Sequence, residues 1–392
     1  MSKFEVPSVP IRAIEPIVGA DAIELAVVGD YRSVVKKNTF QAGDVVIYIP
    51  EGSVVPDWLL ARMGLTDKLD GSGKNRVKAR KLRGCLSQGL ILGLEDVLVF
   101  YPDNVSGGVI MAHCPFTNTY AVMNGMPDTP GNNFANVLGI TKYEPPIPAS
   151  MAGEVCNIHG HTIAYDIENN KKYPDVLEDG EPVIFTEKLH GTYCQIGVVP
   201  GFDHKDLYEG MGYIASKGLG AQGLVFKFNE KNQGNVYFRA MANLRATEDD
   251  SVLPIWDRLV AMFGTNAYLM GEVYGQGVQD LAYGEKNVRF RAFDLYVGKP
   301  GLGRYLNVDE KIDAFKQLGV EMVPILYRGP YSKELAAIHR DGKTVAGNGA
   351  NIREGIVITP DIERIDNSIG RVILKDVSAD YLLRKGDATE FT

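Results

Sequence analysis

One apolar run that ends in a lysine constrains this chain more than any other feature. Val183–Phe185 leads through Thr186 and Glu187 to Lys188, and Gly191 follows three positions later. Such a run is typical of a buried strand, here with a cationic amine at its end. A lone K-x-x-G arrangement is common by chance, so other segments must decide whether this lysine does chemistry.

Four later segments place further functional groups at strands and strand ends. Glu272, in a G-E-x-x-G segment, lies where an apolar run meets a turn, and Phe293 lies within a long run expected to be a strand. Glu354, in an E-G-x-V segment, begins a further strand, and Lys375 lies on the last one. Together and in this order, the five segments resemble the covalent nucleotidyltransferase superfamily. Chance does not readily explain such an ordered set.

The residue types themselves suit transfer of a nucleotide to a lysine. An amine must be neutral to attack phosphorus, whereas a free lysine has a pKa of about 10.4. Burial and nearby cations lower the pKa of a lysine. Lys217, Lys375 and a divalent metal are each expected to act in this way on Lys188, and also to neutralise phosphate charge. We therefore predict Lys188, Lys217 and Lys375 as catalytic residues.

Two carboxylates and one aromatic ring complete the expected nucleotide site. Glu272 and Glu354 offer the oxygen ligands that Mg²⁺ or Mn²⁺ prefers, and we predict both as metal ligands. Strand alternation places Phe293 opposite Asp294, so Phe293 is expected to stack on adenine and Asp294 to give packing or polar support. The residues to which the resemblance assigns ATP binding are Glu187, Lys188, Gly191, Lys217, Glu272, Phe293, Glu354 and Lys375.

The position of a second domain selects a branch of the superfamily. DNA ligases and capping guanylyltransferases carry an OB-fold domain after the final lysine strand, but only 17 residues follow Lys375. An N-terminal barrel would instead resemble the ATP-dependent RNA ligases with an N-terminal OB module. His190, which lies between Lys188 and Gly191 where many relatives have aspartate, also resembles RNA ligases.

The expected fold is of the α+β class, with two domains. Residues 1–150 are expected to form a small β-barrel, an OB-like nucleic-acid-binding module with a connector. Residues 151–392 are expected to form an α/β nucleotidyltransferase (ATP-grasp-like ligase) domain built on antiparallel sheets. Segments 76–90 and 138–146 extend the resemblance over most of the chain, and residues 100–137 are not covered by it.

The resemblance implies an ATP-dependent RNA ligase that seals 3′-hydroxyl and 5′-phosphate ends, in RNA repair. Lys188 would take AMP from ATP and release pyrophosphate, AMP would move to a 5′-phosphate, and a 3′-hydroxyl would displace it. ATP with Mg²⁺ or Mn²⁺ is the expected cofactor set, and RNA, as a nicked duplex or as broken ends, is the expected partner. Neither a membrane nor an obligate protein partner is indicated.

Two positions depart from the superfamily pattern. Val377 stands where many relatives have a second lysine, and Arg371, or Arg384 with Lys385, could supply that charge. Tyr193 stands where some RNA ligases have asparagine, which leaves metal binding near the first motif open. A catalytically weakened protein that only holds RNA ends therefore stays an alternative. A DNA ligase-like or other polynucleotide adenylyltransferase is the other alternative.

The N-terminal part contains short strands and a basic stretch. Runs such as Val45–Ile49, closed by glycine turns such as Gly29-Asp30, are typical of small barrels. The net charge of −8 argues against binding nucleic acid by bulk attraction, so a nucleic-acid site must be local. A strand here would place the cations on one face, and a solvated edge strand is the alternative. The residues predicted to bind nucleic acid are Lys74, Arg76, Lys78, Arg80 and Arg83.

Glycine and proline mark the connector, and one helix is well signalled. Residues 103–151 are rich in both residue types, so we expect loop-like structure and a domain boundary near residue 150. Asn307 can cap a helix, Glu310 completes a capping box, and Gly319 ends the helix.

Two weaker motifs indicate other kinds of site. The G-x-G-x-x-G pattern at 218–223 suits a dinucleotide only if a helix follows directly, and the run from Leu224 is expected to be a strand. A zinc site is a further alternative, although the irregular spacing of its residues favours ordinary loop positions. Those residues are His113, Cys114, Cys156, His159 and His161.

Neither a membrane span nor a secretory signal is visible, since the chain has no run of about 18 apolar residues and no basic-then-apolar N-terminus. The cysteines are scattered, which is typical of reduced thiols, so a cytoplasmic protein is expected. They are Cys85, Cys114, Cys156 and Cys194.

Overall fold

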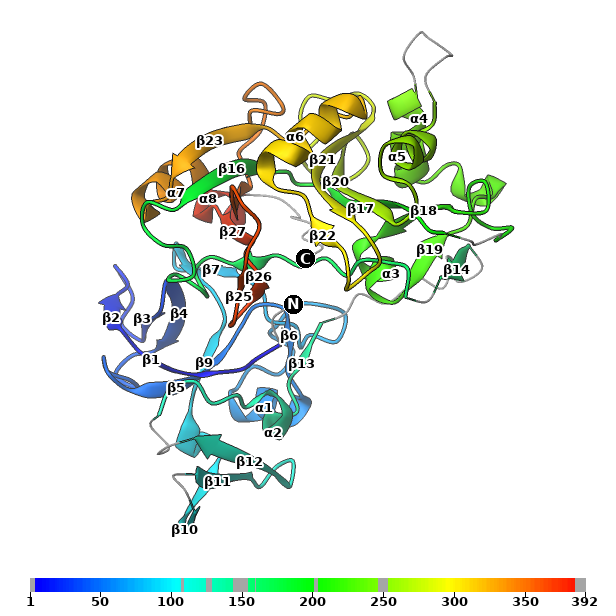
Figure 1. Ribbon diagram of the computed structural model, residues 1–392. Coiled ribbons are helices and arrows are strands. Elements are labelled where there is room, and N and C mark those ends of the chain that lie inside the picture. Colours follow the sequence, from blue (N-terminus) through cyan, green and yellow to red (C-terminus); the bar gives the residue numbers. More distant parts are fainter. Residues whose placement is uncertain are drawn as a thin grey trace. The chain divides into compact units, whose positions relative to one another are not determined.

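A computed structural model describes the chain at residues 4–106, 109–124, 129–143, 154–158, 160–200, 204–245 and 253–384. It divides into two compact units, residues 2–144 and 145–391. Figure 1 shows that strands predominate in both.

The N-terminal unit consists of short strands in small antiparallel sheets. Its three-stranded sheets have the orders β1-β5-β9, β2-β3-β4 and β10-β11-β12. Two buried apolar clusters fill the unit. The strands are β1 (Ser8–Pro10), β2 (Ala13–Pro16), β3 (Ile23–Val28), β4 (Tyr31–Lys36), β5 (Val45–Ile49), β6 (Ser53–Val54), β7 (Arg80–Leu82), β8 (Cys85–Ser87), β9 (Leu90–Gly93), β10 (Val99–Ser106), β11 (Val109–Cys114), β12 (Thr119–Asn124) and β13 (Thr141–Lys142). The helices are α1 (Asp57–Arg62) and α2 (Ala135–Leu138), with a 3₁₀ turn at Leu94–Asp96.

Local sequence signals in this unit are confirmed where a glycine closes a hairpin. β5 covers the predicted run Val45–Ile49, and β3 and β4 flank the predicted turn at Gly29 and Asp30. Gly29 has a positive φ of 55°, which glycine adopts without steric cost.

The basic stretch departs from its predicted strand. Residues 71–74 form a turn, and Arg76 makes only isolated bridges, so β7 begins at Arg80. The Arg76 side chain is buried, with its guanidinium 3.8 Å from the centre of the Tyr143 ring. Lys74 and Arg83 are exposed, whereas Arg80 pairs with Asp70 at 3.0 Å. The cations therefore do not share one strand face.

The predicted loop over residues 103–151 is wrong for its first part, which contains the end of β10 and the whole of β11 and β12. Ile110, Ala112 and Cys114 alternate into the core, as a strand requires. The outward face is also apolar, since Tyr120 and Val122 are exposed on β12. An apolar outer face hides the alternation that would reveal a strand in the sequence.

The C-terminal unit is built on two five-stranded sheets, with the orders β15-β27-β24-β16-β23 and β18-β17-β20-β21-β22. All neighbouring pairs in them are antiparallel except β15 with β27, which confirms the predicted sheet type. The strands are β14 (Val155–Asn157), β15 (Glu168–Asn169), β16 (Pro182–Lys188), β17 (Thr192–Val198), β18 (Gly212–Ser216), β19 (Leu224–Phe226), β20 (Ala267–Gly275), β21 (Val288–Val297), β22 (Arg304–Tyr305), β23 (Ile325–Pro330), β24 (Gly355–Pro360), β25 (Ile365–Asp366), β26 (Gly370–Arg371) and β27 (Leu374–Val377). The helices are α3 (Lys217–Ala221), α4 (Val236–Arg245), α5 (Ile255–Phe263), α6 (Val308–Gln317), α7 (Lys333–Arg340) and α8 (Ala379–Leu382), with a 3₁₀ turn at Glu230–Asn232.

Each sheet has one face covered by helices and one that takes part in a shared core. Helices α4, α5 and α6 pack on the outer face of β17, β20 and β21, and α7 packs on the outer face of β16 and β24. A third cluster joins the inner faces, because Met270 of β20 and Tyr193 of β17 share it with Val357 of β24. The layers of the two sheets can be followed in Figure 1.

Two predicted local features of this unit are confirmed. Helix α6 begins after Asn307, whose N–H donates to the Glu310 carboxylate at 2.8 Å, and a capping box is present. Strand β19 begins at Leu224, directly after the glycine-rich segment. That segment therefore lacks the following helix that a dinucleotide site requires.

A buried charge cluster lies on the inner face of the second sheet. Asp294 is fully buried, and it accepts hydrogen bonds from Arg371 at 2.6 Å and from the Tyr165 hydroxyl at 2.7 Å. Lys311 lies 3.7 Å away. The polar support predicted for Asp294 therefore has defined partners, and Arg371 is one of them.

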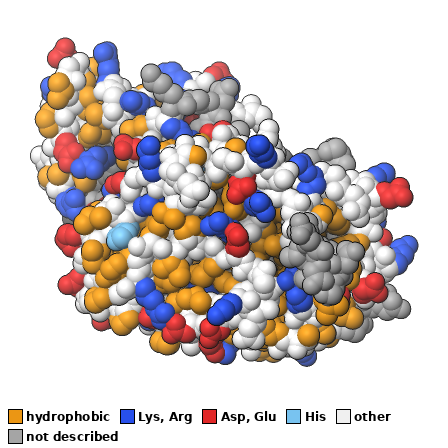
Figure 2. All heavy atoms as spheres, turned by 90° about the horizontal axis from the view of Figure 1, so that it is seen from above, with side chains coloured by type: hydrophobic (Ala, Val, Ile, Leu, Met, Phe, Trp, Pro, Cys, Tyr) orange, Lys and Arg blue, Asp and Glu red, His pale blue; other side chains and the backbone are white. Residues whose placement is uncertain are grey.

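The surface of the molecule carries charges of both signs (Figure 2). On the face seen in Figure 2, basic and acidic side chains are interspersed. Among the helices within the described ranges, none has the length and apolar character needed to span a bilayer. All four cysteines are free thiols.

We predict that Arg371→Met destabilises the C-terminal unit by about 3 kcal/mol, because it leaves the Asp294 carboxylate buried without its main partner. In a unit of this size the apparent Tm should fall by about 6–12 °C. The matched control is Arg304→Met, which removes the exposed Arg304–Glu310 pair, and its cost should be about 0–1 kcal/mol. Equal Tm changes for the two variants would contradict this interpretation.

Candidate active site

Strand register gathers the predicted lysines of the first and last motifs on one sheet face. Lys188 of β16 pairs with Gly355 of β24, and Val357 two residues later pairs with Lys375 of β27. Directly paired residues in antiparallel strands project to the same face, and so do residues two apart. Lys188 and Lys375 therefore project from the inner face of this sheet.

The Lys188 amine donates a hydrogen bond to Oε1 of Glu354, which immediately precedes β24. The Glu354 side chain is 10% exposed and that of Lys188 is 24% exposed. The second oxygen of Glu354, Oε2, is buried and accepts no hydrogen bond from the described residues. A buried carboxylate oxygen without a donor is costly, which is typical of a group that awaits a ligand.

Gly355 allows this arrangement because β24 and β27 approach closely there. A Cβ on Gly355 would lie 2.1 Å from the carbonyl oxygen of Asp376. The close packing of these two strands therefore requires the glycine of the E-G-x-V segment.

The second sheet supplies Glu272 from β20. Its carboxylate accepts a hydrogen bond from the Gly191 N–H, and it interacts electrostatically with Lys188 and Glu354. A Cβ on Gly191 would lie 2.2 Å from the carbonyl oxygen of Val273, so only glycine fits between these strands. Burial raises the pKa of Glu272 to about 8, and the nearby Glu354 carboxylate acts in the same direction.

The Lys375 amine lies within electrostatic range of the amines of Lys217 and Lys188. Burial lowers the pKa of Lys375 to about 8, and the positive charges of Lys217 and Lys188 act in the same direction. Lys217 is the first residue of α3, and its amine lies 3.0 Å from the carboxylate of Asp166. The predicted catalytic lysines are thus brought together, and Asp166 is an acidic partner that the sequence did not reveal.

Phe293 lies at an irregularity in strand pairing. The register of β20 and β21 shifts between Met270 and Gly271, which leaves Phe293 as an extra residue on β21. Its ring centre is 5.5 Å from that of Tyr165 and 6.1 Å from that of Tyr193. The ring is partly exposed and lies on an aromatic wall, so its stacking on adenine stays a prediction.

Glu187 projects to the other face of β16. Its Oε2 accepts hydrogen bonds from the backbone N–H groups of Val345 at 2.9 Å and Ala346 at 3.1 Å. Glu187 is 2% exposed. It therefore anchors the loop that leads to Glu354, and a direct role in ATP binding stays a prediction.

The residues proposed to compensate for Val377 have other partners. Val377 pairs with Gly355, so it projects from the same face as Lys188. Arg371 is bound to Asp294 and Glu363, and Arg384 pairs with Asp280 at 3.2 Å. Lys385 lies outside the described residues. The charges of Arg371 and Arg384 are therefore engaged elsewhere.

A divalent metal and a nucleoside triphosphate fit this donor set. Glu272 and Glu354 present carboxylate oxygens, the ligands that Mg²⁺ and Mn²⁺ prefer, and Glu354 Oε2 accepts no hydrogen bond within the described part of the chain. A bound cation would also relieve the cost of two adjacent buried carboxylates. The lysine amines are suited to phosphate oxygens.

Family comparisons agree with this geometry. Residues 181–377, slightly more than half of the chain, match the RNA ligase family. This chain belongs to the RNA ligase family. Residues 8–94 match an OB-fold domain, which confirms the expected N-terminal OB module of this RNA ligase. A search of curated protein sequences gave no match.

Solved structures show the same fold over the whole ligase. Naegleria gruberi RNA ligase with PPi is 24% identical, with a TM-score of 0.68, and the match covers 97% of this chain and 98% of that one. A lysine mutant of the Naegleria enzyme with ATP and Mn is 23% identical, with a TM-score of 0.67 and coverage of 97% and 98%. A second lysine mutant, with AMP and Mn, is 24% identical, with a TM-score of 0.68, and the match covers 96% of this chain and 98% of that one.

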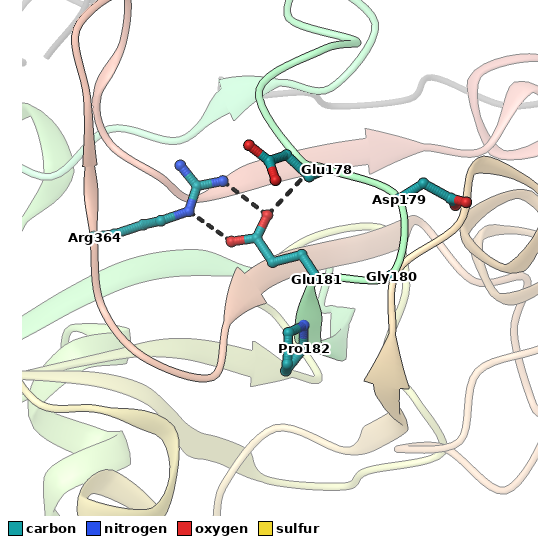
Figure 3. Close-up of a pocket in the computed structure, with 6 residues that line it drawn as sticks. All are labelled: Glu178, Asp179, Gly180, Glu181, Pro182 and Arg364. Carbon is teal, nitrogen blue, oxygen red and sulfur yellow. Dashed lines mark hydrogen bonds and ion pairs between the residues drawn. The ribbon is translucent and has the colours of Figure 1, made fainter.

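A surface pocket of this RNA ligase lies at the other end of β16 (Figure 3). Pro182 begins the strand and Lys188 ends it, so pocket and amine are about 20 Å apart. Glu181 and Arg364 in the pocket are paired at 2.6 Å. Its acidic lining does not suit a triphosphate. The pocket is lined by Glu178, Asp179, Gly180, Glu181, Pro182 and Arg364.

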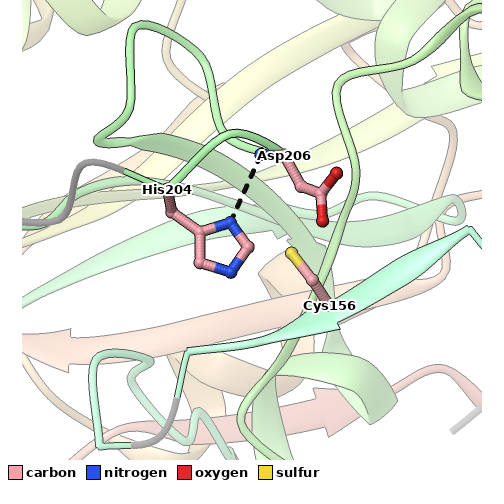
Figure 4. Close-up of side chains that lie close together, drawn as sticks. All are labelled: Cys156, His204 and Asp206. Carbon is pink, nitrogen blue, oxygen red and sulfur yellow. Dashed lines mark hydrogen bonds between the residues drawn. The ribbon is translucent and has the colours of Figure 1, made fainter.

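The residues of the zinc alternative are divided between the two units. His113 and Cys114 belong to β11 of the N-terminal unit, and His159 lies outside the described residues. Cys156 instead lies near His204 and Asp206 (Figure 4). Lys227 lies 3.5 Å from that Asp206 carboxylate, and such a cation competes with a metal ion.

We predict that Lys375→Met makes the ligand-free ligase more stable at pH 7. The folded state lowers the pKa of Lys375 from 10.5 to about 8, so the charged amine lowers stability most below pH 8, and the cost vanishes as the pH rises to 10.5. Removing the amine should add about 3 kcal/mol at pH 7. Thermal unfolding at pH 7 and pH 10 measures this difference.

The control is Lys316→Met on the exposed side of α6, which should change stability by less than about 0.5 kcal/mol at either pH. A Lys375→Met protein less stable than the parent at pH 7 would show that the amine is not held at electrostatic cost.

Proposed function

We propose that this protein is an ATP-dependent RNA ligase that seals 3′-hydroxyl and 5′-phosphate ends through an AMP adduct on Lys188. The observation that carries the proposal is the contact of Lys188 with Glu354, with Glu272, Lys217 and Lys375 around it. RNA repair is the proposed role, in the cytoplasm. The Naegleria relatives bind ATP, AMP, PPi and Mn, which supports ATP and a divalent cation as ligands here.

The proposed chemistry has three transfers. The Lys188 nitrogen attacks the α-phosphorus of ATP, so an N–P bond forms, the bond to pyrophosphate oxygen breaks, and the ammonium proton leaves. A 5′-phosphate oxygen then attacks the same phosphorus, the N–P bond breaks, and the Lys188 nitrogen takes up a proton from solvent. Finally a 3′-hydroxyl attacks the capped 5′-phosphorus, a phosphodiester forms, and AMP leaves with the hydroxyl proton released.

The chain's own groups suit the first of these transfers. Lys217 and Lys375 disfavour a charged amine nearby by Coulomb repulsion, and they favour the negative charge of the leaving pyrophosphate. Glu354 holds the amine in place by its hydrogen bond. A divalent cation held by Glu272 and Glu354 would neutralise phosphate charge.

We predict that Lys188→Ala abolishes covalent labelling by α-labelled ATP, because the variant lacks the amine that Glu354 holds between the two sheets. The same variant should still join an RNA whose 5′ end already carries AMP, since that step needs no N–P bond. A gel-based joining assay with the two RNA substrates measures this. Lys227→Ala, outside this lysine cluster, is the control and should behave like the parent in both assays.

Labelling of the Lys188→Ala protein would refute the proposed nucleophile. A parent protein that binds RNA ends but joins neither substrate would support the end-binding alternative. Equal sealing of RNA and DNA nicks would remove RNA specificity, because the 2′-hydroxyl is the group that distinguishes the polymers.

We further predict that Lys74→Glu with Arg83→Glu weakens RNA binding and lowers its salt dependence. Both side chains are exposed, and each cation that no longer pairs with a phosphate should reduce the slope of log K against log salt by about 1. Filter binding at several salt concentrations measures the slope.

The control reverses Lys36 and Lys37, two exposed cations of the same unit, and should leave the slope unchanged. Arg76→Gln should lower stability, because its guanidinium is buried on Tyr143, and should have little effect on salt dependence. If both double variants change the slope equally, the basic stretch is not a specific RNA contact.

A further inference from the structure

Both ring nitrogens of His190 contact residues outside the five motif segments. Its Nε2 lies 2.5 Å from Oδ1 of Asp280, in the loop after β20, and its Nδ1 lies 2.7 Å from the hydroxyl of Tyr381 on α8. The His190 side chain is 4% exposed. Its backbone N–H donates to the Tyr283 hydroxyl at 2.6 Å.

The two partners of the imidazole are themselves joined by Arg384. The Arg384 guanidinium donates to Asp280 at 3.2 Å and to the Tyr381 carbonyl at 2.8 Å, and it lies 3.7 Å from the centre of the Tyr381 ring. Tyr381 is fully buried. Asp280, Arg384 and Tyr381 thus form a closed set of contacts around His190, which we call the C-terminal clamp.

The hydrogen-bonding groups define the orientation of the ring. A carboxylate only accepts, so Nε2 of His190 donates its proton to Asp280. In the neutral form of the ring, Nδ1 is an acceptor and the Tyr381 hydroxyl donates to it. With both nitrogens engaged, the imidazole cannot rotate without losing a buried hydrogen bond.

His190, which the clamp holds, lies beside Glu354, and the segment after β27 contacts the same glutamate. Nδ1 of His190 lies 3.9 Å from Oε2 of Glu354, the oxygen that accepts no hydrogen bond from the described residues. The backbone N–H of Ser378, the residue before α8, donates to the Glu354 carbonyl at 2.8 Å. The segment after β27 is therefore hydrogen-bonded to the backbone of the residue whose carboxylate holds Lys188.

We propose that Tyr381 is a positioning residue of the ligation reaction: with Asp280 and Arg384 it fixes His190 against Glu354, so that Glu354 holds Lys188 in place before ATP binds. The inference rests on the proposed role of Lys188 as nucleophile. It assigns a function to the segment after the final lysine strand and to Asp280, which belongs to none of the five motif segments.

Tyr381→Phe tests this role because it removes one hydroxyl and keeps the buried ring. Loss of one buried hydrogen bond in a pre-organised set should slow covalent labelling of Lys188 at saturating ATP by about five- to tenfold. The ATP concentration that gives half the maximal rate should change by less than about twofold, because the hydroxyl acts through His190 and Glu354 and not on the nucleotide. Single-turnover labelling over a range of ATP concentrations measures both quantities.

The matched control is Tyr208→Phe, which removes a hydroxyl that donates to the Asp257 carboxylate at 3.3 Å in the same unit. Both variants should have Tm values close to one another, and only Tyr381→Phe should label slowly. Asp280→Ala, which removes the acceptor of the ring on its other side, should slow labelling by a similar factor. The variant with both changes should label Lys188 at no less than about half the rate of the slower single variant, since both changes act through His190.

The outcomes separate the inference from the function on which it rests. If the parent forms no adduct on Lys188, the proposed function fails and the inference falls with it. If the parent labels and Tyr381→Phe labels at the same rate, the clamp has no positioning role while the proposed function stands. Equal slowing in Tyr208→Phe, or multiplicative effects in the double variant, would also overturn it.

Discussion

The register of β16 against β24 is the constraint on which the site depends. It places Lys188 beside Gly355, and hence beside the carboxylate of Glu354 that precedes it. A slip of one residue would turn the lysine to the outer face, among the apolar side chains beneath α7. The lack of a Cβ on Gly355 and on Gly191 lets neighbouring strands approach closely enough for the two carboxylates to meet the amine.

The site concentrates charges that a folded chain normally avoids burying. Lys188, Lys217 and Lys375 lie near one another, and burial alone already disfavours the charged form of Lys375 and the ionised form of Glu272. Such an arrangement lowers stability in the ligand-free protein, and it is tolerated where ligands of the right charge complete it. Elsewhere in the same unit the buried carboxylate of Asp294 is paired with two cations. That cluster is therefore a structural ion pair, in contrast to the carboxylates beside Lys188.

Local patterns in the sequence were sufficient for the elements that carry the motifs. The run before Lys188 is a strand, the capped helix at Val308–Gln317 is present, and the antiparallel sheets of the ligase domain agree with the expected class. The signals failed where side chains on both faces are apolar, as in β11 and β12, and where a cation packs on a ring, as Arg76 does on Tyr143. Hydrophobic periodicity cannot reveal such strands or such a buried cation, because it depends on the polarity of each side chain and not on what that side chain contacts.

Contacts between distant residues were not accessible to the same reasoning. His190 was visible in the first motif, but its partners are separated from it by 90 and 191 residues. Asp166, which pairs with Lys217, has no motif around it. Only the folded strand order brings such groups together, so these partners of His190 and Lys217 can be identified from the structure and not from the sequence.

The site of modification by ATP is the most direct evidence for or against Lys188 as the nucleophile. The full-length protein would be incubated with ATP and Mn²⁺, digested under mildly alkaline conditions that preserve a phosphoramide bond, and analysed by peptide mass spectrometry. We expect AMP on the peptide that contains Lys188, bonded to the side-chain nitrogen of that residue. AMP on Lys217 or Lys375 instead, or no AMP on any lysine, would contradict this assignment.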